Sequence, residues 1–422
     1  MDKLVIEGGN RLEGVVPISG AKNAVLPLMA ATLLASDEFR LRNVPDLRDV
    51  HTMKELLQEL GVDVTFTDDV LDIDTRSLTT NKAPYELVKK MRASVLVLGP
   101  LLARTGEASV PLPGGCAIGT RPIDLHLSGL EAMGAEVEVE HGDVKAEVDQ
   151  LTGSEIYLDF PSVGATENLM MAAARAGGTT VIENAAREPE INCLGEFLSK
   201  IGSEVQGVGQ ERVEIQGTRE CQGITHEVIG DRIEAGTFLI AGAITRGDVT
   251  VQDVNPDHLR SVLDKLKQAG YELETHNENE ISLDAEGQFP DPADIVTMPY
   301  PGFPTDMQAQ FMALMTVANG SSTIKETIFE DRFMHVLELE RFGADIKIDG
   351  NTATVHGVDE LSGAPVMATD LRASAALVIG SLAAEGRSDV RRIYHLDRGY
   401  EQLEEKLRNL GATIWRAEAE GP

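Results

Sequence analysis

Cysteine is scarce in this sequence, which contains three among its 422 residues: Cys116, Cys193 and Cys221. They lie far apart and lack the close spacing of metal ligands, so we expect neither a disulfide framework nor a metal site. Such a chain is typical of a reducing compartment. We interpret Cys193 and Cys221 as small buried side chains, the usual role of a free cysteine.

Long apolar runs and a signal peptide are also missing. No segment approaches the roughly 20 apolar residues that cross a membrane, and the first residues, Met-Asp-Lys-Leu, lack the basic and apolar regions of a secretory signal. The apolar fraction of 42% is that of a globular protein, and the length exceeds what one core supports. We therefore expect a cytoplasmic protein of two or three domains, without a membrane partner.

Positive charge is in short supply. Lysine and arginine total 37 against 69 acidic residues, which gives a net charge of −32, and only 13 of the 37 are lysines. Nucleic-acid binding requires a basic surface, so we expect no nucleic-acid partner. We interpret the acidity as an adaptation to high salt, in which screening removes the repulsion between like charges.

An internal repeat of about 70 residues organises the chain. A helix of small apolar residues runs from Asn23 to Ser36, and similar helices lead to turns at Gly106, Gly177, Gly247, Gly320 and Gly386. Amphipathic helices alternate with them and close at Gly61, Gly134, Gly202, Gly270, Gly343 and Gly411. We expect these six glycines to form left-handed helix caps, and the alternating residues after each predict a strand.

The two kinds of helix predict two environments. Residues 262–267, Val-Leu-Asp-Lys-Leu-Lys, have one apolar stripe and a charged face, so this helix should lie on the outside. Residues 238–244, Phe-Leu-Ile-Ala-Gly-Ala-Ile, are apolar nearly all round, which requires burial on every side. Six such buried helices would form two groups of three, and each group would occupy the centre of one domain.

Polar residues gather at the N-terminal ends of the buried helices: Lys22 and Asn23, Arg92 and Ser94, Ser162 and Thr166, Asp231 and Arg232, Asp306, and Asp370 with Arg372. If three helices run parallel in each domain, their positive ends meet at one face, and two opposed faces would make a cleft for a multiply anionic ligand. The alternative is that the aspartates are only helix caps. Caps alone do not explain the cations, which oppose the helix dipole.

The loop at 111–122 reads Pro-Leu-Pro-Gly-Gly-Cys-Ala-Ile-Gly-Thr-Arg-Pro. Glycine-rich loops lie at the surface and often carry function. Cys116 lies five residues before Arg121, and a nearby guanidinium favours the reactive thiolate. No apolar periodicity surrounds this cysteine, so we predict a reactive thiol in preference to a buried one.

Seven motifs carry a resemblance: Ser-Gly-Ala-Lys-Asn-Ala (19–24), Gly-Gly-Cys-Ala-Ile-Gly-Thr-Arg-Pro-Ile-Asp (114–124), Ser-Val-Gly-Ala-Thr (162–166), Glu-Asn-Ala-Ala-Arg-Glu-Pro-Glu (183–190), Pro-Thr-Asp (304–306), Glu-Asp-Arg-Phe-Met-His (330–335) and His-Leu-Asp-Arg-Gly (395–399). Over essentially its whole length the chain resembles the UDP-N-acetylglucosamine 1-carboxyvinyltransferases, a family of enolpyruvyl transferases. The resemblance implies an α/β fold, the two-domain inside-out α/β barrel of the EPSP synthase type, built from six βαβαββ repeats. It also implies a first domain at 22–229 and a second at 1–21 plus 230–422, with the active site in the cleft between them.

By this resemblance the enolpyruvyl group of phosphoenolpyruvate moves to the 3′-hydroxyl of UDP-N-acetylglucosamine and phosphate leaves, in the first committed step of peptidoglycan precursor synthesis. Neither a cofactor nor a metal is implied. Cys116 would be the acid that protonates the methylene carbon, and the thiol that fosfomycin alkylates. Asp306 would receive the hydroxyl proton. The phosphate and carboxylate would be held by Lys22, Arg121 and Arg398, with Arg92 and Arg372 beside them.

The other contacts implied by the resemblance are Asn23; Arg121, Pro122, Ile123, Asp124 and Leu125 at the nucleotide; Ser162, Val163 and Gly164 at the diphosphate; Asp306 and Ile328 at the amino sugar; and Glu188 and Asp370 as helpers in proton transfer. One departure is Phe160-Pro161, where some relatives have a lysine at the first position. A diphosphate contact is therefore missing or supplied by Arg92. For Arg398 the alternative is an ion pair with Asp397 or Glu401.

Three other functions stay open. A 3-phosphoshikimate 1-carboxyvinyltransferase shares the implied fold and chemistry but lacks the cysteine loop. An RNA 3′-phosphate cyclase is disfavoured by the acidity. A silent paralogue that only binds UDP-sugar is disfavoured by the intact set of Cys116, Asp306, Lys22 and Arg398. The sequence leaves the oligomeric state open.

Overall fold

The computed structural model describes residues 2–112, 123–329 and 331–418, which form two compact units. Residues 20–112 and 123–229 form one, here called the inserted unit, because residues 2–19 and 230–418 on either side of it form the other, the split unit. Each unit has its own hydrophobic core.

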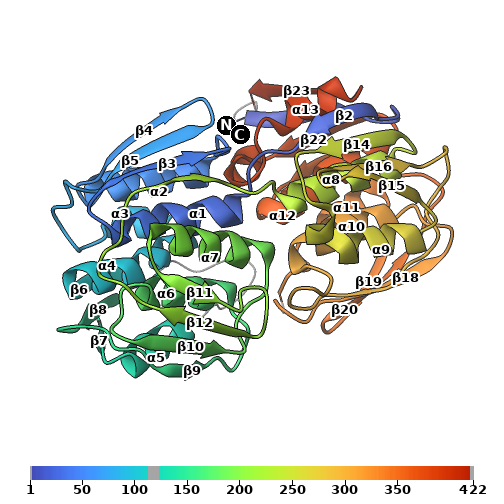
Figure 1. Cartoon of the computed structure of the whole chain (residues 1–422). Helices are drawn as coiled ribbons and strands as arrows, with labels where there is room; N and C mark the ends of the chain where they lie inside the picture. Colours follow the sequence, from blue (N-terminus) through green and yellow to red (C-terminus); the bar gives the residue numbers. More distant parts are fainter. Residues whose placement is uncertain (1, 113–122, 330, 419–422) are drawn as a thin grey trace. The chain divides into compact units, whose positions relative to one another are not determined.

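The elements of the inserted unit, with η marking a short 3-10 helix, are α1 (Lys22–Ala31), η1 (Thr32–Leu34), β3 (Glu38–Arg42), α2 (Arg48–Glu59), β4 (Asp63–Thr67), β5 (Val70–Asp74), α3 (Tyr85–Val88), η2 (Arg92–Val97), α4 (Leu98–Thr105), β6 (Glu107–Pro111), α5 (Asp124–Ala132), β7 (Glu136–Glu140), β8 (Asp143–Glu147), β9 (Glu155–Tyr157), α6 (Val163–Ala173), β10 (Thr179–Glu183), α7 (Pro189–Ile201), β11 (Glu204–Gln206), β12 (Arg212–Gln216) and β13 (Thr225–Glu227) (Figure 1).

The elements of the split unit are β1 (Asp2–Glu7), β2 (Glu13–Pro17), α8 (Arg232–Ile244), β14 (Asp248–Gln252), η3 (Pro256–Leu259), α9 (Arg260–Gln268), β15 (Glu272–Asn277), β16 (Glu280–Asp284), β17 (Ile295–Val296), η4 (Thr305–Met307), α10 (Gln308–Met315), β18 (Ser321–Lys325), α11 (Val336–Leu339), η5 (Glu340–Phe342), β19 (Asp345–Asp349), β20 (Thr352–His356), β21 (Pro365–Met367), α12 (Leu371–Ala383), β22 (Arg387–Arg391), η6 (Ile393–Arg398), α13 (Leu403–Asn409) and β23 (Thr413–Glu418).

Among the described residues, five of the six sheets follow one pattern, in which an edge strand runs parallel to its neighbour and the other pairs are antiparallel. The orders in the split unit are β15-β16-β14-β2, β17-β18-β20-β19 and β21-β22-β1-β23. In the inserted unit they are β13-β3-β5-β4, β11-β12-β10-β9 and β6-β8-β7. In the last sheet an isolated parallel bridge between Lys82 and Ser109 stands in the place of the parallel edge strand. The fold is therefore six βαβαββ repeats, three in each unit, as predicted.

Two chain connections lead from one unit into the other. β2 pairs with β14 in the split unit but leads into α1 of the inserted unit, and β13 pairs with β3 but leads into α8. The N-terminal strand β1 completes the sixth repeat, because it pairs with both β22 and β23, with Asp2 opposite Glu418. The first and last strands of the described chain thus share one sheet.

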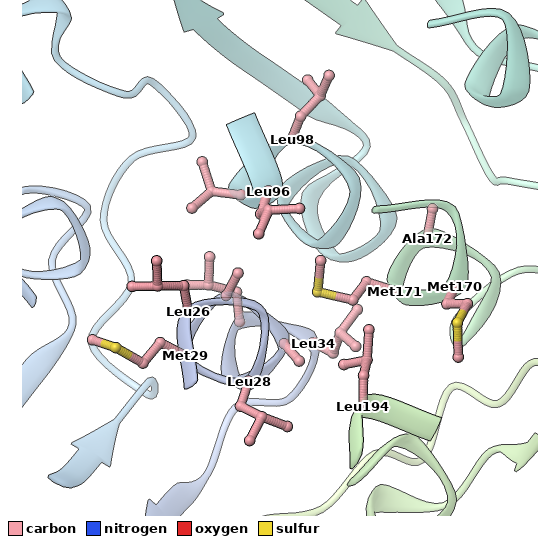
Figure 2. Close-up of a cluster of buried hydrophobic side chains, with 14 of the residues drawn as sticks. Leu26, Leu28, Met29, Leu34, Leu96, Leu98, Met170, Met171, Ala172 and Leu194 are labelled. Atoms are coloured by element: carbon pink, nitrogen blue, oxygen red, sulfur yellow. The ribbon is translucent and has the colours of Figure 1, made fainter. Parts of the chain in front are cut away.

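The predicted buried helices form the centres of the two units. In α8 all 13 residues are buried, and α8, α10 and α12 pack on one another. In the inserted unit α6 packs on both α1 and α4, and Figure 2 shows apolar side chains of these helices in one buried cluster, among them Leu28 of α1, Leu98 of α4 and Met171 of α6. Each such side chain contributes roughly 1.5–3 kcal/mol by leaving water.

The amphipathic helices lie outside these centres, and they end at the glycines predicted from the sequence. In α9 only Val262, Leu263 and Leu266 are buried. The residues predicted as left-handed caps all have positive φ, between 94° and 125°: Gly61, Gly134, Gly202, Gly270, Gly343 and Gly411. This backbone region favours glycine because a Cβ is disfavoured there.

Candidate active site

The N-terminal ends of the three central helices meet within the split unit. Asp231 caps α8 by accepting hydrogen bonds from the backbone N–H groups of Ile233 and Glu234, and Asp370 caps α12 in the same way. The side chain of Gln310 in α10 donates to Thr237 of α8 at 3.3 Å. The expected convergence of positive helix ends is therefore present in this unit.

Asp306 connects these helix ends. Its carboxylate lies 2.9 Å from Nη2 of Arg332 and 3.0 Å from Nη2 of Arg372. The two arginine side chains are 6% and 3% exposed, whereas that of Asp306 is 27% exposed. Burial lowers the pKa of Arg372, but Asp306, Tyr400 and Asp231 together raise it by more, so the pKa lies above its ordinary value. The site thus presents a partly exposed carboxylate held by two buried cations.

The alternative reading of Asp306 as a helix cap is wrong. Asp306 lies inside η4, and neither η4 nor α10 has a side-chain cap. For Asp231 and Asp370 the cap reading is correct.

A buried carboxylate, Glu326, holds the segment around Asp306. Its Oε2 accepts from Thr305 at 2.8 Å, and its Oε1 accepts from the backbone N–H of Ile328 at 2.8 Å. The hydroxyl of Thr305 in turn accepts from Nη1 of Arg332 at 2.8 Å. Asp306 and Ile328, both expected at the amino sugar, are therefore organised by one side chain.

The loop after η6 is fixed to the same helix ends. The guanidinium of Arg372 lies over the ring of Tyr400, 5.5 Å from its centroid, and the Tyr400 hydroxyl is 2.9 Å from that of Thr237. Arg398 ends η6, two residues before Tyr400. The carboxylates considered as its alternative partners have other contacts: Asp397 pairs with Arg416, and Glu401 accepts from the hydroxyl of Ser19.

In the inserted unit, Lys22 and Asn23 open α1. The ammonium of Lys22 lies 3.5 Å from the carboxylate of Asp49 on α2, and both side chains are largely buried. Cations at helix starts were expected to need a bound anion, because they oppose the helix dipole. For Lys22 and Arg372 the protein itself supplies a carboxylate, from Asp49 and Asp306.

The residues expected at the diphosphate lie at the start of α6. The hydroxyl of Ser162 accepts from the N–H of Ala165, and Val163 and Gly164 form the first turn. A Cβ on Gly164 would lie 3.5 Å from Nε2 of His126. Because His126 belongs to α5, the structure brings the start of α5, with Asp124 and Leu125, close to the start of α6.

His126 is a neutral, buried histidine. Its Nδ1 accepts from the amide nitrogen of Asn168 at 3.0 Å, so the proton lies on Nε2. Burial, together with the charge of Arg92, lowers its pKa to about 4. Arg92, at the start of η2, therefore lies near the same region.

Several predicted residues lie outside the described part of the chain: Cys116, Arg121 and Pro122. Ile123 is described as the buried residue before α5. Glu188 precedes α7, and its carboxylate accepts from the N–H of Arg187 at 3.0 Å. Of the two structural cysteines, Cys193 is buried as expected and Cys221 is half-buried.

Sequence reasoning missed four residues that shape these regions: Arg332, Glu326, Tyr400 and His126. Arg332 stood inside a quoted motif, and Tyr400 directly follows another, so motif membership could have flagged both. His126 carries no local signal beyond being polar between two leucines, and Glu326, between Lys325 and Thr327, carries none.

Within the described ranges, the structure contains no helix with the length and apolar character needed to cross a bilayer. The His, Cys, Asp and Glu side chains of those same ranges form no group of three or more suited to a metal ion.

Six βαβαββ repeats in two units, with charged side chains at converging helix ends, define the EPSP synthase class of carboxyvinyl transferases. The family model described as EPSP synthase (3-phosphoshikimate 1-carboxyvinyltransferase) matches residues 6–407. The crystal structure of the enolpyruvyl transferase NikO from Streptomyces tendae is similar to the chain, with a TM-score of 0.89, 26% identity and 99% of each chain covered.

Sequence relatives narrow this class. The UDP-N-acetylglucosamine 1-carboxyvinyltransferase of Desulfosudis oleivorans is 54% identical over 416 residues, which cover 99% of each chain. The protein of the same name from Geotalea uraniireducens is 55% identical over 418 residues, covering 99% of this chain and all of the relative. The chain belongs to the UDP-N-acetylglucosamine 1-carboxyvinyltransferase family, which confirms the resemblance seen in the motifs.

Proposed function

We propose that the protein transfers the carboxyvinyl group of phosphoenolpyruvate to the 3′-hydroxyl of UDP-N-acetylglucosamine. The observation that carries this proposal is the identity of 54–55% over nearly the whole chain to relatives named for that reaction. In the cell this is the first committed step of peptidoglycan precursor synthesis, and we place it in the cytoplasm.

The reaction is an addition followed by an elimination. The sugar oxygen bonds to C2 of phosphoenolpyruvate while C3 gains a proton, which gives a tetrahedral ketal. The C2–O bond to phosphate then breaks, and C3 loses a proton to form the enol ether. Addition needs an acid at C3 and a base at the hydroxyl.

Asp306 is the proposed base. Its carboxylate is partly exposed, and its orientation is fixed by Arg332 and Arg372. A carboxylate has about four acceptor positions, so two guanidinium contacts leave room for a hydroxyl. In the described chain, Nη1 of Arg372 is buried without a hydrogen-bond acceptor, which suits an anionic ligand.

Cys116 is the proposed acid at C3, and its thiol is the proposed target of fosfomycin. Lys22, Arg121 and Arg398 are proposed to hold the phosphate and carboxylate, assisted by Arg92. Residues of both units therefore take part, and we propose that the units act as the two domains of the enzyme.

The remaining assignments concern the sugar nucleotide. Asn23 and residues 121–125 are proposed to contact it, with 162–164 at its diphosphate and Ile328 at its amino sugar. The start of α6 supports the diphosphate assignment, because the N-terminal end of a helix attracts anions through its dipole. Helper roles in proton transfer are proposed for Glu188 and Asp370.

The test measures phosphate release from phosphoenolpyruvate with UDP-N-acetylglucosamine, with shikimate 3-phosphate, and with neither. We expect release only with the nucleotide sugar. Release with shikimate 3-phosphate instead would assign the alternative carboxyvinyl transfer. No release with either acceptor, despite binding of the nucleotide sugar, would indicate a silent binding protein.

A further inference from the structure

The chain passes from one unit to the other twice, once at Gly20 and once at Gly230. Backbone hydrogen bonds join the two segments on each side of these glycines. In the split unit the N–H of Asp231 donates to the carbonyl of Ser19 at 2.9 Å. In the inserted unit the N–H of Ala21 donates to the carbonyl of Ile229 at 2.7 Å. The two connections therefore run side by side, with Gly20 in one and Gly230 in the other.

Close packing explains the glycine at each passage. A Cβ on Gly20 would lie 1.8 Å from the carbonyl oxygen of Asn43, and one on Gly230 would lie 2.0 Å from that of Asp253. Neither position can hold a side chain without moving backbone.

Ser19 is the last residue of the first passage within the split unit, and all its polar groups are engaged. Its N–H donates to Oε2 of Glu234 at 2.8 Å, and its hydroxyl donates to Glu401. The ammonium of Lys406 donates both to this hydroxyl, at 2.7 Å, and to Oε1 of Glu234, at 2.8 Å. We call Ser19, Glu234, Glu401 and Lys406 the passage network.

The network is largely buried. The side chains of Glu234 and Lys406 are 2% and 14% exposed. Burial raises the pKa of Glu234 to about 7, and the charge of Lys406 opposes this shift. A buried ion pair is weak evidence for stability, since desolvation offsets its attraction, so retention of one at this place calls for another reason.

The buried ion pair lies close in the chain to two of the proposed phosphate-binding cations. Ser19 lies three residues before Lys22, and Glu401 lies three residues after Arg398. The loop between Arg398 and Glu401 is fixed at two further points. A Cβ on Gly399 would lie 2.6 Å from Leu371 of α12, and Tyr400 contacts Arg372 and Thr237.

We propose that the passage network positions Lys22 and Arg398 for the reaction, by tying the segment that enters Lys22 and the loop that follows Arg398 to the same buried groups. This inference rests on the proposed function. The four residues are positioning residues: Ser19 and Glu401 lie on the segments that carry Lys22 and Arg398, and Glu234 and Lys406 hold Ser19 in place. Displacing a binding group by about 1 Å can cost as much as 100-fold in rate.

The experiment compares Ser19→Ala and Lys406→Met with a matched control, Lys3→Met. Lys3 also forms a largely buried ion pair in the split unit, 2.5 Å from Asp389, with side chains 12% and 18% exposed. We measure kcat, KM for phosphoenolpyruvate and melting temperature for each purified full-length variant. A further variant, Ser19→Thr, keeps a hydroxyl at this position and should therefore keep the kcat that Ser19→Ala loses.

We expect kcat to fall about tenfold or more in Ser19→Ala and Lys406→Met, and to stay within about twofold of wild type in Lys3→Met, although the melting temperatures of the two lysine variants fall alike. Because the network acts as a unit, Ser19→Ala combined with Glu401→Gln should lose no more than the worse single variant.

Two results would overturn the inference. One is a kcat in Ser19→Ala and Glu401→Gln equal to that of the control. The other is a loss of kcat that follows melting temperature across all variants, the control included. Failure of the proposed function gives a different pattern, because the wild-type protein itself would then release no phosphate with UDP-N-acetylglucosamine.

Discussion

Replacing Asp306 by Asn should separate chemistry from binding. The change removes one negative charge from between two guanidinium groups that are 6% and 3% exposed. Removing one partner of a fully buried ion pair costs about 3–5 kcal/mol. Asp306 is 27% exposed, and Asn keeps its shape and one acceptor, so we expect about 2 kcal/mol of lost unfolding free energy. In a unit of this size that lowers the melting temperature by roughly 4–8 °C.

The effect of Asp306→Asn on turnover should be much larger. Loss of a general base typically costs about 100- to 10,000-fold, whereas affinity for UDP-N-acetylglucosamine should change little. The assays are phosphate release and titration calorimetry with the nucleotide sugar. Asp389→Asn is the control, because Asp389 also contacts two cations, Lys3 and Arg387, and is 18% exposed. Turnover of Asp306→Asn within tenfold of wild type would refute the role as base.

Three further predictions concern the whole chain, a buried histidine and the cysteines. The net charge of −32 predicts that melting temperature rises from dilute to molar chloride, and a flat or falling curve would contradict salt adaptation. The pKa of His126 is lowered to about 4, so its contribution to stability, about 3 kcal/mol, is present above pH 6.5 and lost as pH falls toward 4; His126→Gln should show a weaker acid dependence of denaturant unfolding. Fosfomycin should alkylate Cys116, and faster with UDP-N-acetylglucosamine present. The other two thiols should stay unmodified, because burial raises the pKa of Cys193 to about 12 and also raises that of Cys221. An adduct on Cys193 or Cys221, or full sensitivity of Cys116→Asp, would contradict the assignment.

Periodic features of the fold were predictable from the sequence. Residues 238–244 are apolar nearly all round, and their burial in α8 follows from that composition, whereas the burial of Arg232 and Glu234 at the start of the helix does not. Gly411 ends a stripe of apolar residues, and its φ of 100° is the conformation such a cap requires. Both signals are local, since they depend on neighbours within two turns of helix.

The contacts of the candidate site are long-range, and no local pattern encodes them. Asp306 meets Arg372 because α12 packs against α10, and it meets Arg332, which lies in the turn before α11. The sequence therefore allowed a cap reading that the structure excludes. The placing of β1 inside the last sheet likewise depends on pairing across the length of the chain.

The fate of the bridging oxygen of phosphoenolpyruvate tests the central claim most directly. The substrate carries a heavy oxygen isotope between C2 and phosphorus and is incubated with the protein and UDP-N-acetylglucosamine, and the products are analysed by mass spectrometry. Addition and elimination break the C2–O bond, so the label should appear in the released phosphate, with an equal amount of carboxyvinyl nucleotide sugar. Label retained in pyruvate, with no new nucleotide sugar, would show cleavage of the P–O bond and contradict carboxyvinyl transfer.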